Sequence, residues 1–249
     1  MRFAFGVEYD GTSFSGWQIQ KNVRTIQGEL AKALSSVAND NIIPIGAGRT
    51  DSGVHASGQI GHFDTDVSRT PFQWRAGVNT ILPKDVSVQW VRLVDDNFHA
   101  RDQANCRTYR YNILNQNYRS ALNERYAWLI MQDLDDSLMI DALGHLEGKH
   151  NFSCFRASGC QAKTPLRHMY SASLTRKERL ISIELRANAF LYHMVRNIMG
   201  SVIQVGLKKM PPDWIEVLLK SKDRELAGPT APPQGLCLEK VEFLNYSFS

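Results

Sequence analysis

Hydrophobic and polar residues alternate along several short segments of the chain. Residues 2–9 place Phe3, Phe5, Val7 and Tyr9 on one face, which predicts a half-buried strand. Comparable patterns predict strands at 42–45, 59–63, 86–94, 108–114, 126–130, 167–175, 180–187 and 236–243. Apolar residues at helical spacing predict helices after the capping Thr25, from Pro71 to about residue 80, and at 134–146, 190–205 and 212–220.

Both halves of the chain mix antiparallel-type strands with a few helices, which favours the α+β class over a doubly wound sheet. A chain of 249 residues is long enough for two domains of about 100 to 150 residues each. We therefore expect two similar domains, residues 1–104 and 105–249, each with an antiparallel or mixed sheet and flanking helices. Ligand sites favour clefts between such domains, so the active site is expected there.

The formal net charge of +4 is unevenly distributed. Residues 101–209 carry sixteen Lys and Arg against nine Asp and Glu, whereas the segments on either side are slightly acidic. A polyanion such as a nucleic acid is therefore a plausible partner, although scattered, solvated arginines give the same count.

Membrane and metal-binding roles find little support in the sequence. No apolar run approaches the roughly 18 to 20 residues of a membrane helix, and residues 1–11 lack the apolar region of a signal peptide. We therefore expect a cytoplasmic protein that does not bind a membrane. The four cysteines form no CxxC pair, so we expect free thiols and no metal. They are Cys106, Cys154, Cys160 and Cys237.

The stretch GAGRTDSGVHASGQ at 46–59 is the most distinctive segment. It is neither a phosphate loop nor a dinucleotide fingerprint, whose third glycine would fall at Asp51. A nucleophile elbow centred on Ser52 would need glycines at 50 and 54, and both are missing. A metal site is not indicated either, because Asp51 and His55 supply only two ligands. What remains is a turn that presents Asp51 beside Arg49, a neighbour that favours the charged carboxylate. Such a group serves as a base, as a nucleophile or simply as the acceptor of a structural turn.

The segment GRTDSGVHASGQ resembles the signature of the tRNA pseudouridine synthase A family. Seven other stretches resemble the same family in the expected order, so the resemblance covers nearly the whole chain. They are EYDGTSFSGWQIQ at 8–20, VNTILPKDV at 78–86, FHARDQA at 98–104, RTYRYNI at 107–113, NFSCFRASGCQAKTPLRH at 151–168, NAFLYHMVRNIMGSVIQVG at 188–206 and GLCLEKVEF at 235–243.

The resemblance implies a pseudouridine synthase fold and an isomerase that acts on the anticodon stem-loop of tRNA. A uridine at position 38, 39 or 40 would be detached at N1 and reattached through C5, with no cofactor and no metal. Family members are usually homodimers. Two alternatives stay open: a non-catalytic tRNA-binding or folding protein on the same scaffold, and an aspartate-dependent hydrolase of small phosphoesters, which needs more acids around magnesium than 46–59 supplies.

The resemblance also implies residue roles. Asp51 matches the essential aspartate, which would attack C1′ of the ribose or C6 of the uracil, or abstract a proton. Tyr109 matches a tyrosine that stacks on the target base, Arg196 a basic residue that pairs with the aspartate, and Leu236 an apolar wall of the uracil pocket. Without the resemblance, these three residues are a core tyrosine, a surface arginine and a strand leucine.

Further residues are expected to bind the RNA backbone. Arg49 would hold the phosphate of the flipped-out nucleotide or steady the loop. The remaining candidates come mainly from the basic middle of the chain and would contact phosphates. They are His55, Arg101, Arg107, Arg110, Arg156, Lys163, Arg167 and His168. For His55, the alternative is a histidine that orders its own loop.

Overall fold

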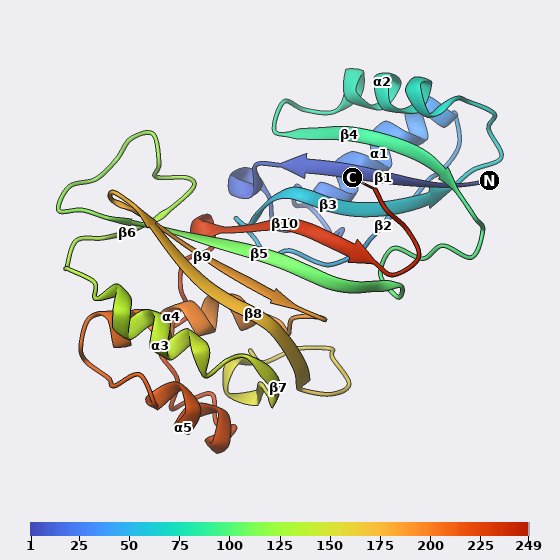
Figure 1. Cartoon of the computed structure of the whole chain (residues 1–249). Coiled ribbons are helices and arrows are strands. Elements are labelled where there is room, and N and C mark those ends of the chain that lie inside the picture. Colours follow the sequence, from blue (N-terminus) through green and yellow to red (C-terminus); the bar gives the residue numbers. More distant parts are fainter. Residues whose placement is uncertain (249) are drawn as a thin grey trace. The chain divides into compact units, whose positions relative to one another are not determined.

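The computed structural model describes residues 1–248, which divide into two compact units (Figure 1). The first unit contains Met1–Asn105 together with the segment from Cys237 onwards, and the second contains Cys106–Leu236. The first boundary lies one residue from the position expected from the sequence. The C-terminal segment groups with the first unit and not with the second domain, where it was expected.

The sheet of the first unit has the strand order β4-β1-β3-β10. Its strands are β1 (Arg2–Tyr9), β3 (His55–Asp64), β4 (Val86–Val94) and β10 (Leu236–Phe243), and the short β2 (Ile45–Gly46) pairs with β3. Strand β1 runs antiparallel to β3 and β4, whereas β10 runs parallel to β3. The alternation in β1 buries the predicted face, since Phe3, Phe5, Val7 and Tyr9 are all at most 4% exposed.

Two helices, α1 (Ile26–Ala38) and α2 (Pro71–Ile81), belong to the first unit and lie side by side (Figure 1). The Thr25 side chain caps α1, and Thr70 forms a capping box at the start of α2. Trp74 of α2 is fully buried, and its ring centroid lies 5.0 Å from that of Phe63 on β3. This contact holds α2 against the sheet.

The sheet of the second unit has the strand order β5-β9-β8-β7. Its strands are β5 (Ala104–Asn115), β9 (Leu180–Ala187), β8 (Leu166–Lys177) and β7 (Gly148–Asn151), and β6 (Trp128–Ile130) runs parallel to β5. The helices α3 (Asp136–Gly144), α4 (Met194–Gly206) and α5 (Trp214–Ser221) lie on one side of this sheet (Figure 1).

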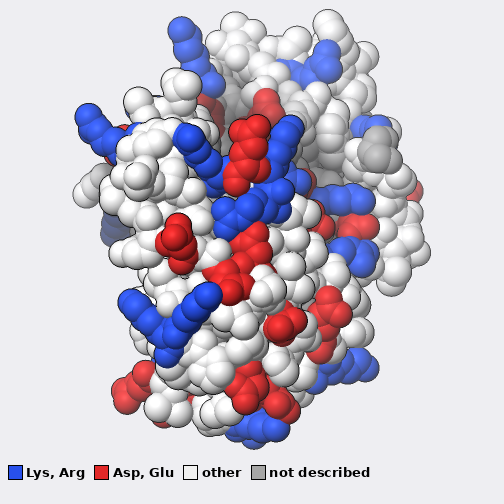
Figure 2. Space-filling model, turned by 60° about the vertical axis from the view of Figure 1, so that its left-hand side comes forward, with Lys and Arg blue, Asp and Glu red and all other residues white. Residues whose placement is uncertain are grey.

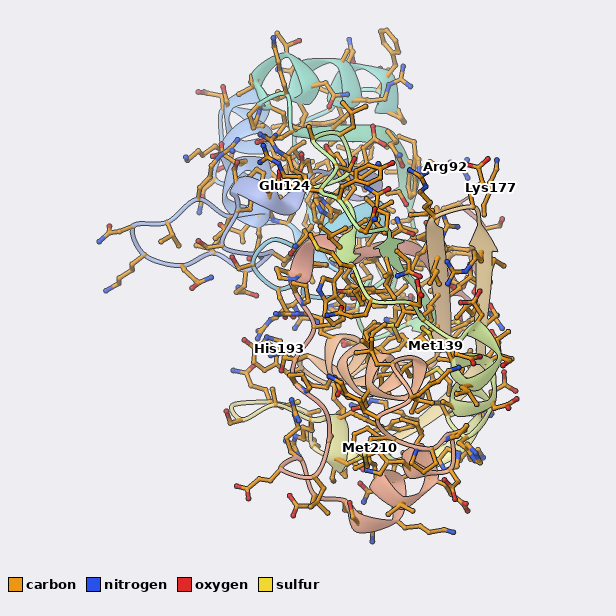
Figure 3. The ribbon with its side chains drawn as sticks, turned by 90° about the vertical axis from the view of Figure 1, so that its left-hand side faces the viewer. Arg92, Glu124, Met139, Lys177, His193 and Met210 are labelled. Atoms are coloured by element: carbon orange, nitrogen blue, oxygen red, sulfur yellow. The ribbon has the colours of Figure 1, made fainter. Side chains whose placement is uncertain are left out.

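Helices α3 and α4 meet through Met139 and Gly206. A Cβ added to Gly206 would lie 2.6 Å from Met139 Sδ, so the absence of a side chain at Gly206 lets the two helices approach (Figure 3). The apolar residues expected to be buried in 190–205 are buried, since Leu191, Val195, Ile198, Val202 and Val205 are at most 5% exposed. Helix α4 is buried on nearly all sides and not along a single stripe.

The α+β class is confirmed, and the differences from the predicted elements lie mainly at their ends. The strand expected at 42–45 is reduced to β2, because the Ser35 hydroxyl bonds the backbone of Ile42 and the Gln27 amide donates to Pro44 O. Strand β3 begins at His55 instead of residue 59. Helix α4 begins at Met194 because the preceding residue, His193, has φ 58°, which is outside the helical range. His193 is labelled in Figure 3. The short strand β7 is an addition to the predicted elements.

Candidate active site

Asp51 lies on a tight turn in the first unit, between β2 and β3. The Val54 amide donates to Asp51 O at 3.1 Å, which closes a four-residue turn. The third residue of this turn is Gly53 with φ +77°, a conformation that glycine adopts without strain and that type II turns require. Asp51 is half-buried, and the neighbouring Arg49 is exposed.

Residues 9–17, here called the brace, hold this turn in place. The Trp17 amide donates to Thr50 O at 3.0 Å, directly before Asp51 in the chain. After Asp51, the Gly53 amide donates to Phe14 O at 3.3 Å, and the Ser52 hydroxyl donates to the same oxygen at 3.1 Å. The backbone is therefore fixed on both sides of the carboxylate. The residue types of 10–17 give no local signal of this bracing role.

His55 is buried at the start of β3, with 6% exposure. Its Nδ1 accepts a hydrogen bond from the Gly11 amide at 3.1 Å and lies 3.2 Å from Asp10 Oδ1. These contacts join the brace to the strand that follows the Asp51 turn. Burial and bonding are consistent with a loop-ordering role, and the RNA contact of His55 stays a prediction.

In the second unit, one stretch of chain joins three of the predicted site residues. Arg196 Nε donates a hydrogen bond to Ala231 O at 2.8 Å, and the Ala231 amide donates one to Arg196 O at 3.0 Å. Five residues after Ala231 comes Leu236, which is 5% exposed. The preceding Gly235 packs on β5, where a Cβ would lie 2.7 Å from Asn112 O. Strand β5 also carries Tyr109.

Tyr109 stands on β5 opposite Leu185 of β9 and is 9% exposed. Its ring lies edge-to-face with Phe190 at 5.0 Å. Tyr111, two residues further along, is fully buried and donates its hydroxyl to Pro232 O at 2.7 Å. Burial raises the pKa of this hydroxyl, so it stays a neutral hydrogen-bond donor. The structure thus brings Tyr109, Arg196 and Leu236 onto one framework, while Asp51 belongs to the other unit.

The predicted phosphate-binding residues fall into two groups. Arg49, Arg101 and Lys163 are exposed, whereas Arg107, Arg110, Arg156, Arg167 and His168 are half-buried. Among the half-buried residues, Arg107 donates to Asn188 O at 2.8 Å, and Arg156 donates to Cys160 O and Ala162 O at 2.7 and 3.0 Å. Burial lowers the pKa of the Arg107 and Arg167 guanidinium groups. Arg156 therefore supports the loop that follows it, whereas Arg107 and Arg110 lie on β5 and Arg167 lies on β8. The exposed Arg49, Arg101 and Lys163 are better placed for phosphates.

Figure 2 shows one face of the molecule, and the surface charges on it do not form a uniform basic patch. On the face that Figure 2 shows, Lys and Arg side chains are interspersed with Asp and Glu side chains. Within residues 1–248, no three His, Cys, Asp or Glu side chains are grouped as a metal site requires. None of the helices in that part of the chain is both long enough and apolar enough to cross a membrane. All four cysteines are free thiols.

A family model and curated relatives of the chain point to one family. A family model described as tRNA pseudouridine synthase matches residues 6–103 and 142–244. A tRNA pseudouridine synthase A from Shewanella denitrificans is 47% identical over 243 residues, which cover 98% of this chain and 93% of the relative. One from Coxiella burnetii is 44% identical over 242 residues, which cover 97% and 93%. Among solved structures, a Cbf5-Nop10-Gar1 complex chain matches with a TM-score of 0.43 and 11% identity, covering 95% of this chain and 49% of that one.

Proposed function

Because the chain belongs to the tRNA pseudouridine synthase family, we propose that it modifies uridines 38, 39 and 40 in the anticodon stem-loop of tRNA, with Asp51 as the nucleophile. Family membership makes the chain an isomerase that produces pseudouridine in tRNA. The target positions and the role of Asp51 are the proposal. The observation that carries it is a partly exposed carboxylate on a turn whose backbone is fixed on both sides.

The reaction rearranges bonds within one nucleotide. The bond between N1 and C1′ breaks, a bond between C5 and C1′ forms, C5 loses a proton and N1 gains one. No electrons are exchanged, so the reaction needs neither an oxidant nor a reductant. Asp51 would assist by attack at C1′ or C6, or by abstraction of a proton.

Tyr109, Arg196 and Leu236 are proposed to bind the same uridine. Tyr109 would stack on the base, Arg196 would supply positive charge, and Leu236 would form an apolar wall. Stacking recovers part of the free energy that is lost when a base leaves the RNA helix. Their shared framework in the second unit supports this assignment.

Release of tritium from uracil C5 tests the proposal directly. The purified protein is incubated, without added metal, with anticodon stem-loop transcripts that carry C5-tritiated uridine. We expect release from transcripts with uridine at 38, 39 or 40, and none when cytidine replaces all three while uridines elsewhere remain. Release from the cytidine-substituted RNA would contradict the target positions. Tight binding without release from any transcript would favour the non-catalytic tRNA-binding alternative.

Affinity for tRNA should fall steeply with salt, because bound phosphates release counterions when Lys and Arg neutralise them. We expect a loss of at least about tenfold between about 50 and about 200 mM salt, measured by filter binding. Lys163→Ala should reduce the slope of log affinity against log salt by about 1. Lys32→Ala, which removes an exposed lysine next to Glu29 on α1, is the control and should leave the slope unchanged. A flat salt response would count against phosphate binding.

Two further parts of the proposal come from the family resemblance. The protein would act as a homodimer, as family members usually do. It would also be cytoplasmic, because its substrate class, tRNA, is modified there.

A further inference from the structure

The brace approaches the Asp51 turn closely at Gly16. This residue has φ +86°, and a Cβ placed on it would lie 2.6 Å from Thr50 O. Both the backbone conformation and the close approach therefore require glycine. The close approach places the brace against the residue that precedes Asp51.

Two buried hydroxyl groups join the brace to that same residue. The hydroxyls of Tyr9 and Thr50 share a hydrogen bond of 2.8 Å. Tyr9 is 4% exposed and Thr50 is 6% exposed, so water competes little for this bond. Thr50 thus has its carbonyl held by Trp17 and its side chain held by Tyr9.

We propose that Thr50 and Tyr9 are positioning residues for the reaction, and that their hydroxyl pair sets the direction of the Asp51 carboxylate. This inference rests on the proposed function of Asp51. One peptide bond separates Thr50 from Asp51, so a rotation of the Thr50 backbone moves the carboxylate. A displacement of about 1 Å at a reacting group lowers a rate by about 100-fold in favourable cases. The brace is bonded to the residues on either side of Asp51. Loss of the bond between Tyr9 and Thr50 should therefore affect the chemical step more than RNA binding.

Variants that change only the hydroxyls test this inference. Thr50→Val keeps the shape of the side chain and removes its hydroxyl, Tyr9→Phe removes the other hydroxyl, and Thr50→Ser keeps the hydroxyl without the methyl group. We expect Thr50→Val and Tyr9→Phe to lower kcat for tritium release by about tenfold or more, with KM little changed. Thr50→Ser should retain most of the wild-type kcat. The double variant should be little slower than Thr50→Val, since both substitutions break the same bond.

Thr65→Val is the matched control. Thr65 is also a buried threonine of the first unit, with 7% exposure, and its hydroxyl accepts a hydrogen bond from the Val67 amide at 3.1 Å. It follows directly after β3, at the other end of the strand from His55. Thermal unfolding of every variant checks that the folded state is retained. Thr65→Val should lose stability as Thr50→Val does while its kcat stays at the wild-type value.

The outcomes separate this inference from the proposed function. If Asp51→Ala is inactive and Thr50→Val has wild-type kcat, the positioning role is overturned and the role of Asp51 stands. A kcat for Thr50→Ser as low as that for Thr50→Val would also overturn it, because the hydroxyl would not be the group that matters. If Asp51→Ala retains wild-type activity, the proposed role of Asp51 is wrong, and the positioning role that rests on it is wrong as well.

Discussion

Asp51→Ala should abolish tritium release from tRNA while the variant still folds and binds tRNA. The substitution removes the carboxylate that the proposal makes the nucleophile or the base. Loss of such a group lowers kcat by on the order of 10³-fold or more. Binding should be retained or slightly tightened, because a negative charge that repels the RNA phosphates is lost. The measurements are single-turnover tritium release and filter binding at one salt concentration.

Two further variants sharpen the interpretation of that result. Asp51→Asn keeps the shape of the side chain without its charge, and Asp51→Glu keeps the charge on a longer side chain. Both should be strongly impaired if the carboxylate must reach a defined atom of the nucleotide. Asp66→Ala is the control, since Asp66 is an exposed acid of the same unit, and it should retain the wild-type rate. A wild-type rate for Asp51→Ala would remove Asp51 from the reaction.

Elements that depend on local sequence could be predicted closely. Strands β1, β4, β9 and β10 have the predicted bounds. Their alternation is visible within a single segment, and helix α2 is similarly marked by the proline that opens it. The Asp51 turn can also be predicted from local sequence, because a glycine two residues after an acid favours such a turn.

What the sequence could not supply are contacts between segments far apart in the chain. The stretch from His55 to Gly58 has the small and polar composition of a loop. It is nevertheless part of β3, because Ala56 pairs with Tyr9 of β1 and His55 pairs with Cys237 of β10. The brace was missed for the same reason, since Tyr9 and Thr50 are 41 positions apart and neither residue type indicates the other.

Gly200→Ala should destabilise the protein strongly, because Gly200 of α4 lies directly against residues 228–231. An added Cβ would lie 1.6 Å from Pro229 O, and a backbone carbonyl cannot rotate aside as a flexible side chain does. Residues 228–231 are fixed to α4 by further bonds, including Gly228 amide to Ser201 Oγ at 2.9 Å and Thr230 Oγ1 to Asn197 Oδ1 at 2.6 Å.

The expected cost combines overpacking with the loss of these bonds. Overpacking costs about 1 to 3 kcal/mol, and each hydrogen bond that is broken costs about 1 kcal/mol. The higher helix propensity of alanine offsets about 1 kcal/mol. We therefore expect the free energy of unfolding to fall by about 3 kcal/mol, measured by urea denaturation.

Gly200→Ala should also lower the rate of tritium release from tRNA. Arg196 is hydrogen-bonded to residues 228–231, which the added Cβ would displace. Arg196 Nε bonds Ala231 O, so a shift of this segment releases the guanidinium from its place. Gly144→Ala on α3 is the matched control. Its added Cβ meets no atom within 4 Å, so it should stabilise the protein by up to about 1 kcal/mol. If Gly200→Ala unfolds at the same urea concentration as Gly144→Ala, residues 228–231 do not depend on α4. Arg196 would then need another anchor.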